Sequence, residues 1–151
     1  MGAEALTAWI TEHRVCWELS PRVEVHEHKK IQVGYDLTLF ARHPESWKDE
    51  PGCQHCLQHY ETLKEIALQA LPQTHASRCE FAPFDASFHL RPEANWEPEV
   101  QLDVAILHRD STFADVDEDE RTLAAAIEQG LKRLGAKPKA WPGAEPVNRA
   151  R

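Results

Sequence analysis

Apolar and polar side chains alternate along two long stretches of the chain. One stretch covers residues 31–42 and the other covers residues 100–109. A period of two is the side-chain period of a β-strand, and an antiparallel sheet packed on one face gives this alternation. Both stretches are therefore predicted to be strands. In the first, the apolar positions are Ile31, Val33, Tyr35, Leu37, Leu39 and Ala41.

Each of these predicted strands is preceded by a second alternating segment, which predicts two hairpins. In the first hairpin, Val15, Trp17 and Leu19 alternate with polar residues, and the pattern resumes at Val23 and Val25. Pro21 lies between them and is expected to bend or interrupt the strand. Lys29 and Lys30 are expected at the hairpin tip. In the second hairpin the apolar positions are Phe84, Ala86, Phe88 and Leu90.

Three other segments have the apolar spacing of helices. Residues 6–13 predict a short N-terminal helix with one apolar face, and residues 53–71 predict an amphipathic helix that ends at Pro72. The third has Asp117 in its first turn and Arg133 in its last, as the helix dipole favours. Gly135 is expected to end it.

A shift of 67 positions lays residues 33–67 on residues 100–134 with the same apolar rhythm. The chain is therefore predicted to contain two ββα repeats, at about residues 22–72 and 83–135. We expect an α+β fold in α-ββ-α-ββ-α order, with helices on one face of a four-stranded antiparallel sheet. Residues 1–136 would form a single domain, followed by a flexible C-terminal tail at residues 137–151.

This element order resembles the homing-endonuclease-like fold, whose saddle-shaped sheet grips DNA in the LAGLIDADG family. The resemblance covers the element order alone, because the helix starts Gly52-Cys53-Gln54-His55 and Val116-Asp117-Glu118-Asp119 lack the family motif. The net charge of −8 also opposes nucleic-acid binding, which depends on Lys and Arg neutralising phosphates. No nucleic-acid partner is therefore expected.

Composition limits the remaining classes of function. No apolar run approaches the ~20 residues of a membrane-spanning helix, and the N-terminus lacks a signal-peptide pattern. We therefore expect a cytoplasmic protein with no membrane partner. The chain has four cysteines, which in that compartment are expected to be thiols or metal ligands. None of the glycine-rich nucleotide-binding motifs occurs.

The segment Cys53-Gln-His55-Cys56-Leu-Gln-His59 places two thiols and two imidazoles at the start of a predicted helix. Cys53, Cys56 and His59 are candidate ligands of a structural zinc ion, with His43 or Cys79 completing the site. Three alternatives stay open. The CxxC pair is also found in redox proteins, the two histidines are spaced to bind a metal alone, and both thiols lie on the predicted apolar face as core residues would.

The sheet face away from the helices carries a second candidate site. His26 and His28 are expected to point the same way from one strand, beside Asp36 on its neighbour. The repeat places His89 and Asp103 at matching positions. Such residues can bind a metal, an anionic ligand or the polar surface of a partner, and a His–Asp pair can act as a general base. A solvated sheet face with no function has the same composition.

The sequence thus predicts a small binding protein, with a structural zinc site at residues 53–59. The alternative is a module without metal that binds a protein or small molecule through its open sheet face, or that forms a homodimer. A CxxC redox protein and an enzyme that uses the His–Asp pairs are less favoured, and no catalytic residue is assigned.

Overall fold

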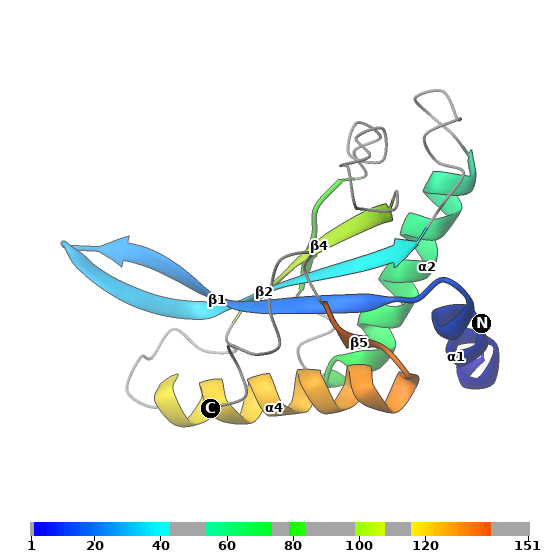
Figure 1. Cartoon of the computed structure of the whole chain (residues 1–151). Helices are drawn as coiled ribbons and strands as arrows, with labels where there is room; N and C mark the ends of the chain where they lie inside the picture. The colour runs from blue at the N-terminus through cyan, green and yellow to red at the C-terminus, as the bar shows by residue number, and fades with distance from the viewer. Residues whose placement is uncertain (1, 43–53, 74–78, 84–98, 108–115, 140–151) are drawn as a thin grey trace, which may run out of the picture.

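The computed structural model describes residues 2–42, 54–73, 79–83, 99–107 and 116–139 (Figure 1). The fold is α+β, as predicted. Its elements in chain order are α1 (Ala3–Glu12), β1 (Cys16–His26), β2 (Lys29–Arg42), α2 (Gln54–Ala70), β3 (Glu80–Phe81), β4 (Glu99–Leu107), α4 (Val116–Leu134) and β5 (Lys137–Pro138). No helix among these residues is long and apolar enough to cross a membrane.

The described strands form one sheet in the order β3-β4-β2-β1-β5. All neighbours are antiparallel except β1 and β5, which are parallel. The sheet therefore has five described strands, where four were predicted. The predicted strand at residues 84–90 lies outside the described residues, so the ββα repeat stays a prediction. Leu37 and Val104, which the shift of 67 superimposes, are paired across the centre of the sheet.

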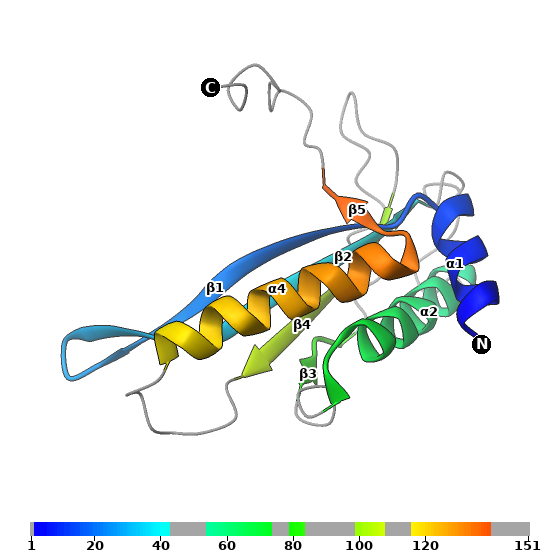
Figure 2. The ribbon, with the colours of Figure 1, turned by 90° about the horizontal axis from the view of Figure 1, so that it is seen from below.

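The helices α1, α2 and α4 lie on one side of the sheet (Figures 1 and 2). The alternating apolar residues of the strands face them, as the period of two predicted. Burial of this face supplies the main stabilisation of the fold, at about 25 cal/mol per Å² of apolar surface. The largest fully buried side chains of the core, from both the sheet and the helices, are Leu6, Ile10, Leu37, Leu39, Leu63, Ile66, Leu102, Val104, Ile106, Ile127 and Leu131.

The end of α4 agrees with the sequence signals. Gly135 has a φ of 101°, which is favourable only for glycine, and its N–H donates to the carbonyl of Lys132. The N–H of Ala136 donates to the carbonyl of Leu131. These two bonds form the Schellman motif that ends many helices. The predicted stop at Gly135 is therefore confirmed.

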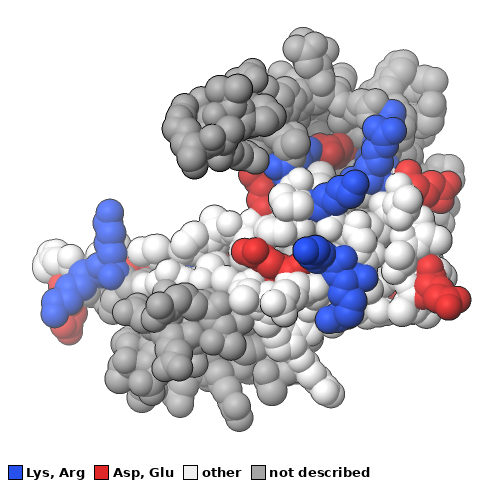
Figure 3. All heavy atoms as spheres, turned by 60° about the horizontal axis from the view of Figure 1, so that its bottom comes forward, with Lys and Arg blue, Asp and Glu red and all other residues white. Residues whose placement is uncertain are grey.

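The hairpin of β1 and β2 extends beyond the rest of the sheet (Figure 1). Among the described residues, β4 pairs with β2 as far as Gly34, and the outer part of the hairpin runs past this point. Val23 and Val25 are 51% and 67% exposed there, although they continue the apolar alternation of the strand. Figure 3 shows the charged side chains at its far end, where Glu27, Lys29 and Lys30 are exposed.

The tip of this hairpin is a two-residue turn made by Glu27 and His28. Their φ angles are 50° and 67°, as the twisted type I′ turn of a hairpin requires. The predicted tip at Lys29 and Lys30 is thus wrong, because these residues begin β2. Pro21 lies within the continuous strand β1, and the irregularity in pairing falls next to it, between Arg22 and Val23.

The segment predicted to be a tail begins inside the sheet. Residues Lys137–Pro138 form β5, and the N–H of Lys139 donates to the carbonyl of Trp17. Backbone pairing therefore fixes the chain as far as residue 139. Residues 140–151 lie outside the described part of the chain.

Candidate functional site

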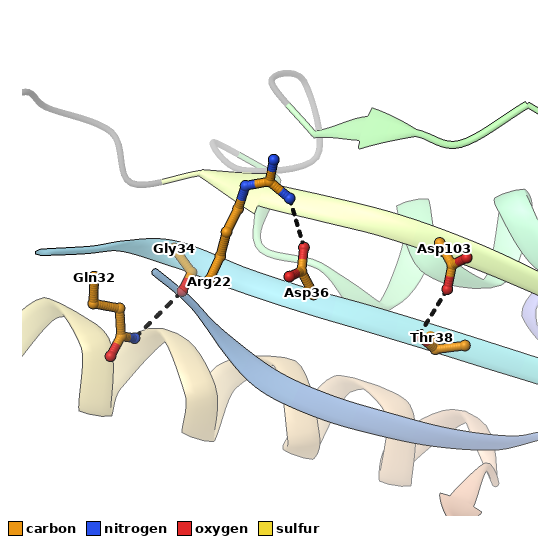
Figure 4. Close-up of polar contacts among 6 residues, drawn as sticks. All are labelled: Arg22, Gln32, Gly34, Asp36, Thr38 and Asp103. Carbon is orange, nitrogen blue, oxygen red and sulfur yellow. Dashed lines mark hydrogen bonds and ion pairs between the residues drawn. The ribbon is translucent and has the colours of Figure 1, made fainter. Parts of the chain in front are cut away.

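A pocket of about 460 Å³ lies on the sheet face away from the helices. The alternation of the strands determines which side chains reach it, because Leu37 and Val104 point to the core and their neighbours point outward. Figure 4 shows Arg22, Asp36 and Asp103 on this outward side. The pocket is lined by Arg22, Asp36, Glu80, Phe81, Ala82, Asp103, Val104 and Ala105.

Arg22 and Asp36 form an ion pair at one end of this open-face pocket. Arg22 comes from β1, and its Nη1 donates to Asp36 Oδ1 on β2 at 2.9 Å (Figure 4). Both side chains are partly exposed, so the pair contributes little to stability. The Nε atom of Arg22 is buried and has no hydrogen-bond partner among the described residues. One donor of the guanidinium is therefore left without a partner in the described part of the chain.

Asp103 on β4 is held by donors from two strands. Thr38 Oγ1 donates to Asp103 Oδ1 at 2.8 Å, and Gln101 Nε2 lies 3.3 Å from both carboxylate oxygens. The backbone carbonyl of Asp103 accepts a bond from the N–H of Ala82, next to β3. Strand β3 also brings the exposed Glu80 opposite Ala105. The pocket therefore combines three carboxylates with one guanidinium.

The backbone places neither His26 nor His28 next to Asp36. Asp36 pairs with Ser20, and His26 lies six residues further along β1, a distance of about 20 Å in an extended strand. His28 belongs to the turn, where it is exposed. The backbone register therefore does not place His26 beside Asp36, and His28 lies in the turn instead of on the strand. His89 lies outside the described residues.

The predicted zinc ligands are only partly described, since Cys53 and His43 lie outside the described residues. Cys56 is fully buried in the hydrophobic core, and His59 is half-buried one turn later on α2. Cys79 is also half-buried, and burial raises the pKa of its thiol. Within the described ranges, no group of three or more His, Cys, Asp or Glu side chains is placed to hold a metal ion. The zinc site stays a prediction.

The structure brings together His13 and His59, which the sequence did not connect. Their ring centroids are 4.8 Å apart, and the ring of His13 also stacks on that of Trp9. The helical spacing of Trp9 and His13 predicted their shared face. Nothing in the local sequence indicates that α2 would place His59 against it.

A second polar contact crosses the outward face near β5. Lys139 forms an ion pair with Glu99 on β4, and its ammonium lies 4.4 Å from the ring centroid of Phe40. The Lys139 side chain is only 8% exposed. Burial raises the pKa of the nearby Cys16 thiol to about 11. The sequence pattern did not predict this contact, because it predicts a flexible tail at residues 137–151.

Comparison with models of protein families, with curated proteins and with solved structures found no match. The function must therefore be inferred from the residues of the site alone.

Proposed function

We propose that this protein is a small binding module whose open-face pocket takes a cationic group. The observation that supports this proposal most directly is the convergence of Asp36, Asp103 and Glu80 on one pocket that contains a single guanidinium. Arg22 already pairs with Asp36. Asp103 and Glu80 leave an excess of negative charge, to which an ammonium or guanidinium group is complementary.

The arrangement of donors around Asp103 supports this choice of ligand. Thr38 and Gln101 fix the carboxylate from neighbouring positions on the sheet, so it does not have to be ordered when a ligand binds. A bound guanidinium could then make charge-assisted hydrogen bonds to the remaining acceptor sites.

The size of the pocket favours a small molecule or a single side chain. A volume of about 460 Å³ falls within the range of small-molecule sites, about 300–1,000 Å³. The site is built on paired strands, which hold side chains more rigidly than loops do. The exposed carboxylates predict binding that weakens as the salt concentration rises.

The test is a titration followed by amide NMR shifts, with arginine amide as the cationic probe and glutamate as an anion of similar size. Arginine amide should shift amide signals around Asp36, Ala82 and Asp103, and Asp103→Asn should weaken its binding roughly tenfold, because one charged hydrogen-bond acceptor is lost. Glu61→Gln on α2 is the matched control, since Glu61 is an exposed carboxylate outside the pocket. Equal binding of glutamate, or an unchanged affinity of Asp103→Asn, would refute the proposal.

A structural zinc ion at Cys53, Cys56 and His59, completed by His43 or Cys79, is kept as a separate proposal. It is supported by the ligand spacing in the sequence, while the burial of Cys56 favours the alternative of a core cysteine. Elemental analysis of protein purified without a His-tag decides between them. About one zinc per chain that is lost in Cys53→Ser would support the site.

A further inference from the structure

The end of α1 and the first half of α2 place two imidazoles side by side. The ring centroids of His13 and His59 are 4.8 Å apart, with an interplanar angle of 85°. Both side chains are half-buried, and the His13 side chain is 20% exposed, so solvent reaches part of the pair. Imidazole is the commonest metal ligand among side chains.

The hydrogen bond of His13 determines which ring nitrogen can bind a metal. Its Nδ1 lies 2.9 Å from the backbone carbonyl oxygen of Trp9. A carbonyl oxygen only accepts, so Nδ1 must carry the proton and donate it. In the neutral ring the lone pair is then on Nε2. Metal-binding histidines characteristically donate their other N–H to a carbonyl in this way, which fixes the tautomer and the ring orientation.

The surroundings of His13 hold the ring in place before any metal binds. Its backbone N–H also donates to the carbonyl of Trp9, and its own carbonyl accepts a bond from the N–H of Arg42 at 2.7 Å. The ring stacks on the indole of Trp9 at 4.0 Å and 21°. The backbone and the side chain of His13 are thus both fixed, which lowers the entropy lost on binding.

The separation of the two rings matches a shared metal ion. A Zn–N bond of about 2.1 Å puts the metal about 3.2 Å from each ring centre, so two rings at 90–109° lie about 4.5–5.2 Å apart. The observed separation of 4.8 Å falls in this range, which overlaps the range of the edge-to-face contact that the two rings make. We infer that His13 and His59 form a binding site for one divalent transition-metal ion of the zinc, nickel or copper class, with water in the other positions.

This two-histidine site is separate from the open-face pocket, but it shares His59 with the zinc site proposed at Cys53, Cys56 and His59. A bound ion would tie α1 to α2, and therefore couple the N-terminal helix to the core. Because the protein supplies two ligands, binding is weaker than at a structural site with four. Imidazole ligands favour nickel, copper and zinc over magnesium or calcium.

The test is calorimetric titration of the full chain with Ni²⁺, compared among the wild type, His13→Gln and His59→Gln. Each substitution should weaken binding roughly tenfold or more, because a ligand is removed. His28→Gln is the matched control, since His28 is exposed in the hairpin turn, and it should bind like the wild type. Circular dichroism checks that each variant is folded.

Thermal unfolding with Zn²⁺ gives a second measurement. At about 100 times the Kd, Zn²⁺ should raise the Tm of the wild type by about 5 °C or more, and this rise should be absent in His13→Gln. Unchanged Ni²⁺ affinity in both His13→Gln and His59→Gln would overturn the inference. Metal binding that is lost in Cys53→Ser and unchanged in His13→Gln would also overturn the inference, because it would assign the metal to the cysteine segment.

Discussion

Replacement of Gly130 by alanine tests how closely α2 and α4 pack. Gly130 lies in the last half of α4, where a Cβ atom would stand 2.0 Å from the carbonyl oxygen of Ala70 and 2.9 Å from its carbon. These are backbone atoms of another helix, so no side-chain rotation can relieve the contact. The two helices would have to separate locally by about 1.4 Å to restore ordinary contact distances of 3.4 Å or more.

Two opposing effects determine how much Gly130→Ala changes the free energy of unfolding. Alanine favours a helix interior over glycine by about 0.5–1 kcal/mol. Forcing extra volume into a packed interface costs about 1–3 kcal/mol. Here the overlap is with rigid backbone, so we expect the upper part of that range and a net loss of about 1–2 kcal/mol in the free energy of unfolding. For a chain of this size, that loss lowers Tm by about 3–6 °C.

Urea denaturation and thermal unfolding of Gly130→Ala measure this loss. Gln129→Ala is the matched control, because Gln129 is exposed on the same helix and its substitution should change stability by less than about 0.5 kcal/mol. A Gly130→Ala variant as stable as the wild type, or more stable, would mean that helix propensity outweighs the clash and that α2 and α4 are further apart than described.

The polar contact near β5 makes two further predictions. Lys139→Ala should lower the free energy of unfolding by about 2 kcal/mol in urea denaturation, because it leaves Glu99 without its partner in a largely buried position. The double substitution Lys139→Met/Glu99→Gln removes both charges and should recover much of this loss. The pKa of Cys16 is raised from 9.0 to about 11, so the stability that it contributes is complete below pH 9 and is lost between pH 9 and 11. Stability measured across this range should therefore fall less steeply in Cys16→Ala, and parallel curves would contradict this.

Local periodicity determined the elements and the faces they bury. The helix predicted at residues 53–71 is Gln54–Ala70, and the strand predicted at residues 31–42 is contained in Lys29–Arg42. Period and burial are linked because an element with one apolar face must pack that face on another layer. The same logic placed Asp36 and Asp103 on the outward face, although the partner of Asp36 proved to be Arg22.

The edge of the sheet and the contacts between distant residues depend on the packing of the whole chain. Val23 and Val25 have the alternation of core residues, yet they are exposed because the hairpin extends beyond the rest of the sheet. The contacts of His13 with His59, and of Gly130 with Ala70, each join two helices. Periodicity shows which face of a helix is apolar, but the approach of two helices depends on how all the side chains between them pack. That packing is a property of the whole chain, which no local segment contains.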